Sequence, residues 1–77
     1  MSERKGLDLY VVYSNPRDFP GKHVIRRQFA TASGIKAFYL PHCVVDTLEE
    51  ARATLPPGLV CIARDQSDDP VIVESWI

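Results

Sequence analysis

The segment from Asn15 to Arg27 gathers the cationic side chains most suited to binding chemistry. Its five cations surround a single acid, Asp18, and an aromatic residue lies between two turn-forming pairs. Guanidinium groups match the geometry of phosphate oxygens, and an aromatic side chain at a loop tip can stack on a base. The segment therefore predicts a candidate surface for phosphate or nucleic acid. The candidate binding residues are Arg17, Phe19, Lys22, His23, Arg26 and Arg27.

Two features of this segment weaken the nucleic-acid interpretation. Arg26 and Arg27 are neighbours, so on a strand they point to opposite faces and at most one joins a given patch. Phe19 could equally fill the core beneath its own loop. The strands also lack the aromatic signature of the common RNA-binding sheets. The alternative is a charged face that is exposed to solvent and binds nothing, and we favour it. Nucleic-acid binding is therefore only our second interpretation of the function.

The histidines and cysteines are the other reactive groups. His42 and Cys43 would face opposite ways on a strand, so His42 would not activate the neighbouring thiol. The sequence has no closely spaced ligand pairs for zinc, and residues 65–69 lack the alternating ligands of a calcium loop. We expect no catalytic residue, no metal and no cofactor. A thiol-dependent enzyme is our third interpretation.

Length and composition predict one small domain. The chain has 77 residues, 45% of them hydrophobic and 25% charged, which suits a single globular core. No apolar run approaches the roughly 20 residues that cross a bilayer, and the charged N-terminus has no secretion signal. We therefore expect a cytoplasmic location, no membrane partner, and free thiols at Cys43 and Cys61. We also expect a flexible tail over residues 1–6 and one domain over residues 7–77.

Charge is distributed unevenly along the chain. Residues 1–45 have a net charge of +4 and residues 46–77 a net charge of −5, which together give −1. This asymmetry indicates either a basic binding face or two halves that attract each other within one fold. We favour the second explanation.

Periodicity and turn residues predict most of the strands. Residues Leu7 to Ser14 alternate with bulky apolar groups on both faces, which favours a central strand. A short loop leads to a second strand from His23 to Ala30, which should pair with the first in antiparallel fashion. A third extended stretch, Ala37 to Leu40 and Cys43 to Val45, is interrupted by Pro41 and should be an edge or be broken.

The second half of the chain predicts one helix and two further strands. Thr47 and Glu50 have the spacing of a capping box, and the helix should end at Leu55, before Pro56. Residues 59–63 and 71–77 complete the sheet as strands. The predicted fold class is α+β: a single small domain in ββ(β)αββ order, with four or five mostly antiparallel strands and one helix packed on one face.

Two stretches resemble a group of short bacterial proteins that share a domain of unknown function. The first is Tyr10 to Arg27 (YVVYSNPRDFPGKHVIRR). The second runs from Asp46 through DTLEEAR and LPPGLV to DDPVIVE, which ends at Glu74. The resemblance implies a bacterial origin and a stand-alone domain, and it transfers no catalytic residue.

The favoured function is a non-enzymatic protein-interaction module. The sequence offers no convincing catalytic constellation, the domain is small enough to benefit from a partner, and its charge is split. The terminal strand, which includes Trp76 and Ile77, must be buried or paired because an open apolar edge invites association. We expect an unknown protein partner or self-association through an edge strand to form a homodimer.

Overall fold

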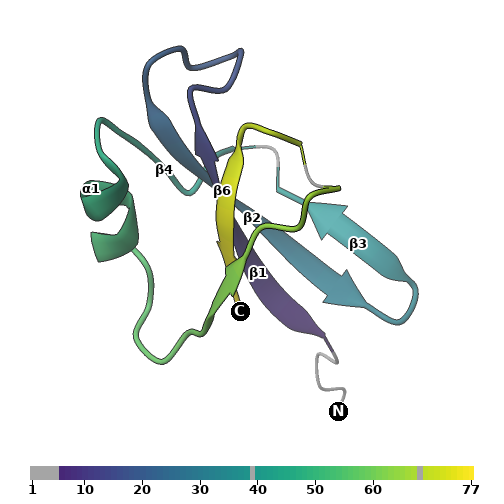
Figure 1. Cartoon of the computed structure of the whole chain (residues 1–77). Coiled ribbons are helices and arrows are strands. Elements are labelled where there is room, and N and C mark those ends of the chain that lie inside the picture. The colour runs from purple at the N-terminus through teal and green to yellow at the C-terminus, as the bar shows by residue number, and fades with distance from the viewer. Residues whose placement is uncertain (1–5, 39, 68) are drawn as a thin grey trace.

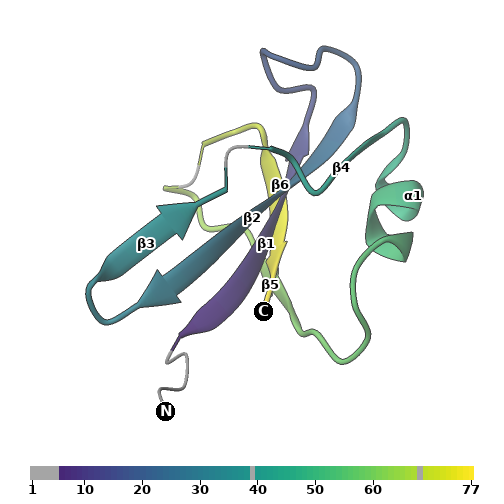
Figure 2. The same cartoon turned by 180° about the vertical axis from the view of Figure 1, so that it is seen from behind.

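The chain folds into one antiparallel sheet with a short helix on one face. The elements are β1 Leu7–Ser14, β2 His23–Thr31, β3 Gly34–Ala37, β4 Cys43–Val45, α1 Leu48–Ala53, β5 Cys61–Ala63 and β6 Ile72–Trp76. The computed structural model describes residues 6–38, 40–67 and 69–77, and these ranges contain six strands. The strand order is β3–β2–β1–β6–β5, and β4 also pairs with β2 (Figures 1 and 2). The predicted α+β class, with a mostly antiparallel sheet and one helix, is confirmed.

The strand count and order correct the prediction. The broken third strand is two separate strands, β3 and β4, so the chain order is ββββαββ and the sheet has six strands. Both fit against β2 because β2 is nine residues long: β4 pairs with residues 23–25 and β3 with residues 28–31. β3 also begins earlier than predicted, at Gly34 after a tight turn. Pro41 lies in the link between the two strands, where no ladder donor is required.

The central strand was predicted correctly. β1 pairs with β2 on one side and with β6 on the other, and Tyr10, Val11 and Val12, which come from both of its faces, are buried. The terminal strand β6 lies between β1 and β5 rather than at an edge. Among the described residues, the strands with one unpaired edge are β3, β4 and β5. Of the predicted tail over residues 1–6, all but Gly6 falls outside the described residues.

A small apolar core lies between the sheet and α1. Tyr10 and Val12 of β1, Ile25 of β2 and Ala51 of α1 form one buried cluster. Val12, Ile25 and Ala51 have no exposed surface. Leu48 and Leu55 also pack against this cluster, so the helical segment buries one apolar face.

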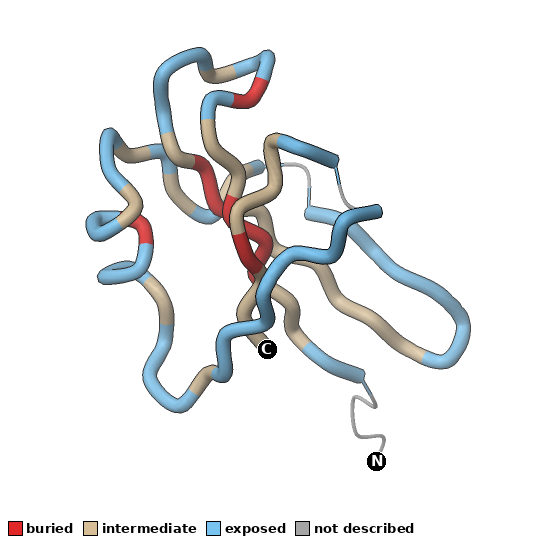
Figure 3. The backbone as a smooth tube through the Cα atoms, viewed as in Figure 1, coloured by how far each residue is buried: buried red, intermediate tan, exposed pale blue. Residues whose placement is uncertain are grey.

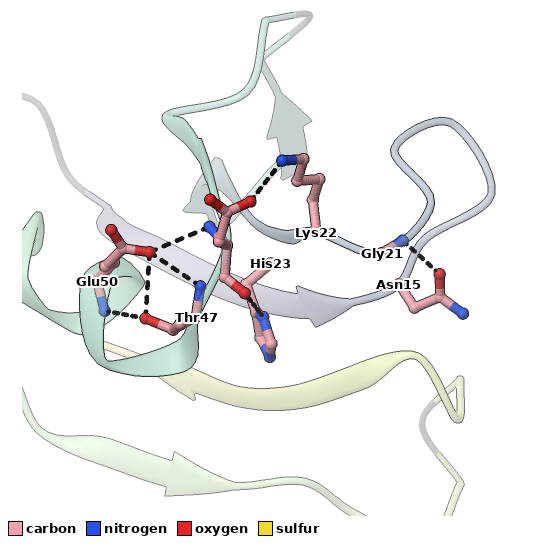
Figure 4. A network of polar contacts seen from close by, with 7 residues as sticks. Asn15, Gly21, Lys22, His23, Thr47 and Glu50 are labelled. Atoms are coloured by element: carbon pink, nitrogen blue, oxygen red, sulfur yellow. Dashed lines mark hydrogen bonds and ion pairs between the residues drawn. The ribbon is translucent and has the colours of Figure 1, made fainter.

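The start of α1 is fixed by the predicted capping box. The Thr47 hydroxyl accepts a hydrogen bond from the Glu50 backbone N–H at 3.1 Å, and the Glu50 carboxylate accepts one from the Thr47 N–H at 3.1 Å (Figure 4). These contacts satisfy backbone donors that have no partner inside the helix. α1 ends at Ala53, earlier than the predicted end at Leu55, with Thr54 as its C-cap. Among the described residues, no helix has the length and apolar character needed to cross a membrane.

Candidate functional site

The cations of residues 15–27 are divided between the two faces of the sheet. Arg26 lies opposite Val11 and Arg27 lies opposite Tyr10 in the β1–β2 register, so adjacent arginines point to opposite faces, as predicted. Arg26 binds Asp18 of the β1–β2 loop, and the Arg27 guanidinium lies 3.1 Å from the Asp8 carboxylate. The two arginines therefore do not form one patch, and each is matched with an acid.

Lys22 and His23 contact Asp46 at the start of β2. The Lys22 ammonium binds the Asp46 carboxylate, and His23 Nδ1 lies 3.4 Å from the Asp46 carbonyl oxygen (Figure 4). The hydrogen bond between the two charged groups raises the pKa of Lys22 and lowers the pKa of Asp46. Lys22 with Asp46 also joins the basic and acidic halves of the chain. The remaining predicted cation, Arg17, is exposed in the β1–β2 loop.

Arg27 lies between two aromatic rings. Its guanidinium carbon is 4.6 Å from the centre of the Phe38 ring and 5.9 Å from the centre of the Tyr10 ring. Its Nε atom is buried and has no hydrogen-bond partner among the described residues. The cation–π contacts hold the start of the β3–β4 link against the sheet. Arg27 therefore has a structural role in placing Phe38.

An apolar groove is formed by this link and the β1–β2 loop. Its volume is about 600 Å³. Phe38, Leu40 and Pro41 from the link face Phe19 from the β1–β2 loop across the groove. Leu40 is 73% exposed, an unusual position for a large aliphatic side chain beside other apolar groups. The lining residues are Asp18, Phe19, Arg26, Ala37, Phe38, Leu40 and Pro41.

Two of the predicted binding residues, Phe19 and Arg26, belong to this groove. Sequence reasoning missed Phe38, Leu40 and Pro41, although the apolar run before a proline was a signal of exposed, irregular backbone. The groove is thus a mainly apolar site with one matched ion pair, Arg26 with Asp18. It differs from the cationic site that the sequence predicted.

β3 borders this groove and exposes its outer edge. All four of its residues are exposed (Figure 3). The Phe38 N–H donates to the Arg27 carbonyl oxygen at 3.2 Å, which makes Arg27 and Phe38 a hydrogen-bonded pair. Such pairs alternate along an antiparallel ladder, so Lys36 directs its backbone groups toward β2 while Ile35 and Ala37 direct theirs away. Among the described residues no strand pairs with that outer edge.

A second polar centre joins α1 to β6. Arg52 donates two hydrogen bonds to the Glu74 carboxylate, at 2.7 and 2.9 Å, and the Trp76 indole N–H donates a third at 2.7 Å. Glu74 is only 5% exposed. The hydrogen bonds from Arg52 lower the pKa of Glu74, whereas burial and the nearby Glu74 carboxylate raise the pKa of the Cys61 thiol. The Glu74 carboxylate thus accepts from three donors, which is the arrangement of a structural contact.

Both cysteines are free thiols, with Cys43 half-buried and Cys61 exposed. The Thr54 hydroxyl donates to Cys43 Sγ at 3.4 Å, and His42 Nε2 lies 3.2 Å from the Thr54 carbonyl oxygen. Cys61 has a raised pKa, the opposite of what an activated thiolate needs. Within the described ranges, no three His, Cys, Asp or Glu side chains are grouped for a metal ion.

Comparison with known proteins adds no relative. No family model, curated protein or solved structure matches the chain. The resemblance to a group of short bacterial proteins therefore stays a prediction. The groove and the edge of β3 are the features from which a function can be argued.

Proposed function

We propose that this chain is a non-enzymatic module that binds a partner protein through the groove beside β3. The observation that supports the proposal most is the groove itself, about 600 Å³ in volume and walled by Phe19, Phe38 and Leu40. Grouped, exposed apolar side chains commonly mark interaction sites, and a concave shape buries more of a bound segment than a flat patch does. The adjacent strand edge adds backbone donors and acceptors.

Phosphate or nucleic-acid binding through residues 15–27 is the alternative, and it has less support. Lys22, Arg26 and Arg27 each bind a carboxylate, so binding phosphate would require these ion pairs to break. Nucleic-acid affinity comes largely from cations that are available to phosphates. Catalysis by a thiol has less support still, because the ring of His42 contacts the Thr54 carbonyl oxygen rather than Cys43, and the pKa of Cys61 is raised.

The proposal is tested by selecting peptides from a random library displayed on phage, with the purified protein as bait. Leu40→Glu places a charge in the groove at an exposed position, so it should abolish enrichment without unfolding the chain. Val60→Glu is the matched control, because Val60 is 64% exposed and lies beside β5 at the other edge of the sheet.

Peptides that bind the natural chain and Val60→Glu, and fail to bind Leu40→Glu, are the expected result. Failure to enrich any peptide, or equal enrichment by Leu40→Glu, would contradict the proposed surface. Turnover of any compound in a broad metabolite panel at useful rates would contradict the non-enzymatic part of the proposal.

A further inference from the structure

We infer that the outer edge of β3 accepts an extended segment of a partner protein in which apolar side chains alternate with acidic ones. This inference rests on the proposed function and specifies the chemistry of the partner. The segment would lie antiparallel to β3 and lengthen the sheet by one strand, with some of its side chains entering the groove.

The backbone of β3 is available for another strand. Ile35 and Ala37 direct their N–H and C=O groups away from β2, and no strand of the described chain covers them. In both views β3 lies at the outside of the sheet, at the far end from α1 (Figures 1 and 2). An added antiparallel strand would form hydrogen-bonded pairs with these two residues. Main-chain hydrogen bonds of this kind give affinity, and alternate side chains give specificity.

The groove-side face of β3 favours apolar residues in the partner. Ile35 and Ala37 share one face because they are two residues apart, and Ala37 also lines the groove. Ile35 is 66% exposed. Residues of an added strand that lie opposite these two would point to the same face. Apolar side chains at those positions would cover Ile35 and extend toward Phe38 and Leu40.

The other face of β3 favours an acid. Lys36 points to that face and has no ion-pair partner among the described residues. Residues 28–45 include Lys36 and no aspartate or glutamate, so the whole edge lacks negative charge. A residue directly opposite Lys36 would have its Cβ about 4.5–5.5 Å away, where an opposite charge stabilises the pair and a like charge destabilises it.

The same lysine disfavours a second copy of this chain as the occupant. In an antiparallel pair of two β3 strands, Ile35 and Ala37 of both copies can all form backbone hydrogen bonds in only one register. In that register Ile35 of each copy lies opposite Ala37 of the other. That register places Lys36 directly against Lys36 of the second copy. Lysines on edge strands commonly prevent such self-pairing. The charge pattern therefore favours an acidic segment from a different protein over a homodimer through β3.

The inference is tested with fluorescein-labelled peptides and the full-length protein, by fluorescence anisotropy at low and physiological salt. The probe is a short peptide in which valine and glutamate alternate, and its matched control has lysine in place of glutamate. We expect the glutamate peptide to bind about fivefold more tightly, or better, at low salt. Lys36→Glu reverses the charge at this position and should therefore reverse that preference. The fold should be kept, because the substitution changes only an exposed side chain.

Two further changes test the hydrogen bonding directly. Ala37→Pro removes an outward N–H while leaving the β2–β3 ladder intact, and it should weaken binding about tenfold. Since a proline variant can lose stability, the peptide is also methylated at backbone nitrogens. Methylation at the valines opposite Ile35 and Ala37 should abolish binding, and methylation at the glutamate opposite Lys36 should be tolerated.

The outcomes separate this inference from the proposed function. The inference is overturned if the two peptides bind equally, or if methylation weakens binding to the same extent at every backbone position. Either result would overturn it even if Leu40-dependent peptides are still selected from the library. A dimer in sedimentation velocity that Ala37→Pro dissociates would also overturn it, because a second copy would then occupy the edge. If the library also yields no Leu40-dependent peptide, the proposed function falls as well.

Discussion

Replacing Glu74 with alanine tests how strongly the contact between α1 and β6 stabilises the fold. The Glu74 carboxylate accepts hydrogen bonds from Arg52 at 2.7 and 2.9 Å and from the Trp76 indole at 2.7 Å. Glu74 is 5% exposed, while 47% of the Arg52 side chain remains exposed. The variant would leave the Trp76 N–H without its partner and would open a small void beside β5.

The size of the effect follows from these exposures. A hydrogen bond to a charged group contributes about 1.5–3 kcal/mol net. Arg52 regains hydration in the variant, so its two bonds are discounted and we expect a total loss of about 2–3 kcal/mol. A domain of this length has an unfolding free energy of about 4–12 kcal/mol. The melting temperature should therefore fall by roughly 10–20 °C.

Thermal and urea unfolding, followed by circular dichroism at neutral pH, measure this loss. Glu49→Ala is the matched control, because Glu49 is an exposed acid in the first turn of α1 and should cost less than about 1 kcal/mol. Glu74→Gln should fall between the two, since the amide oxygen can still accept from Trp76. If Glu74→Ala costs no more than Glu49→Ala, the contact does not stabilise the fold as argued.

The same carboxylate predicts a pH dependence. Hydrogen bonds from Arg52 hold the pKa of Glu74 below its ordinary value of 4.5 in the folded chain. A group with a lowered folded pKa contributes stability that is present above the unfolded pKa and is lost as the pH falls through the folded pKa. The melting temperature of the natural chain should therefore decline below about pH 4.5. In Glu74→Gln this decline should be shallower, and identical profiles would contradict the assignment.

Three further predictions concern the core, the helix cap and a thiol. Ile25→Ala removes a side chain with no exposed surface and should cost about 2–5 kcal/mol in urea unfolding; a loss below about 1 kcal/mol would contradict the core assignment. Thr47→Ala removes the N-cap of α1 and should cost about 0.5–2 kcal/mol by the same method, whereas no loss would show that the cap is dispensable. Because burial and Glu74 raise the pKa of the Cys61 thiol, iodoacetamide should modify it more slowly in the folded chain than in urea, and faster in Glu74→Gln. Equal rates in all three states would refute that reasoning.

Features fixed by neighbouring residues could be predicted from the sequence. The capping box of Thr47 and Glu50 depends on a spacing of three residues, and the opposite directions of Arg26 and Arg27 depend only on strand geometry. The central position of β1 followed from apolar groups on both of its faces. All of these features depend on residues that lie close together in the sequence.

The candidate site could not be predicted in the same way. The acids that bind Lys22 and Arg27 are 24 and 19 residues away, so the sequence suggested a cationic surface where the fold forms matched ion pairs. The groove is lined by Phe19 of the β1–β2 loop and Leu40 of the β3–β4 link, and these distant segments come together only once the sheet has formed. The length of β2 decided the strand count, because it accommodates both β3 and β4.

The most direct test of the central claim is an amide-shift NMR titration of the labelled protein, with the alternating valine–glutamate peptide in one series and a short RNA oligonucleotide in another. Binding through the groove predicts that the peptide shifts residues 18–19, 26 and 35–38, and that RNA at physiological salt shifts none of them. Shifts at Arg17, Lys22 and His23 with RNA, together with an unchanged spectrum in the peptide series, would contradict the account and favour nucleic-acid binding.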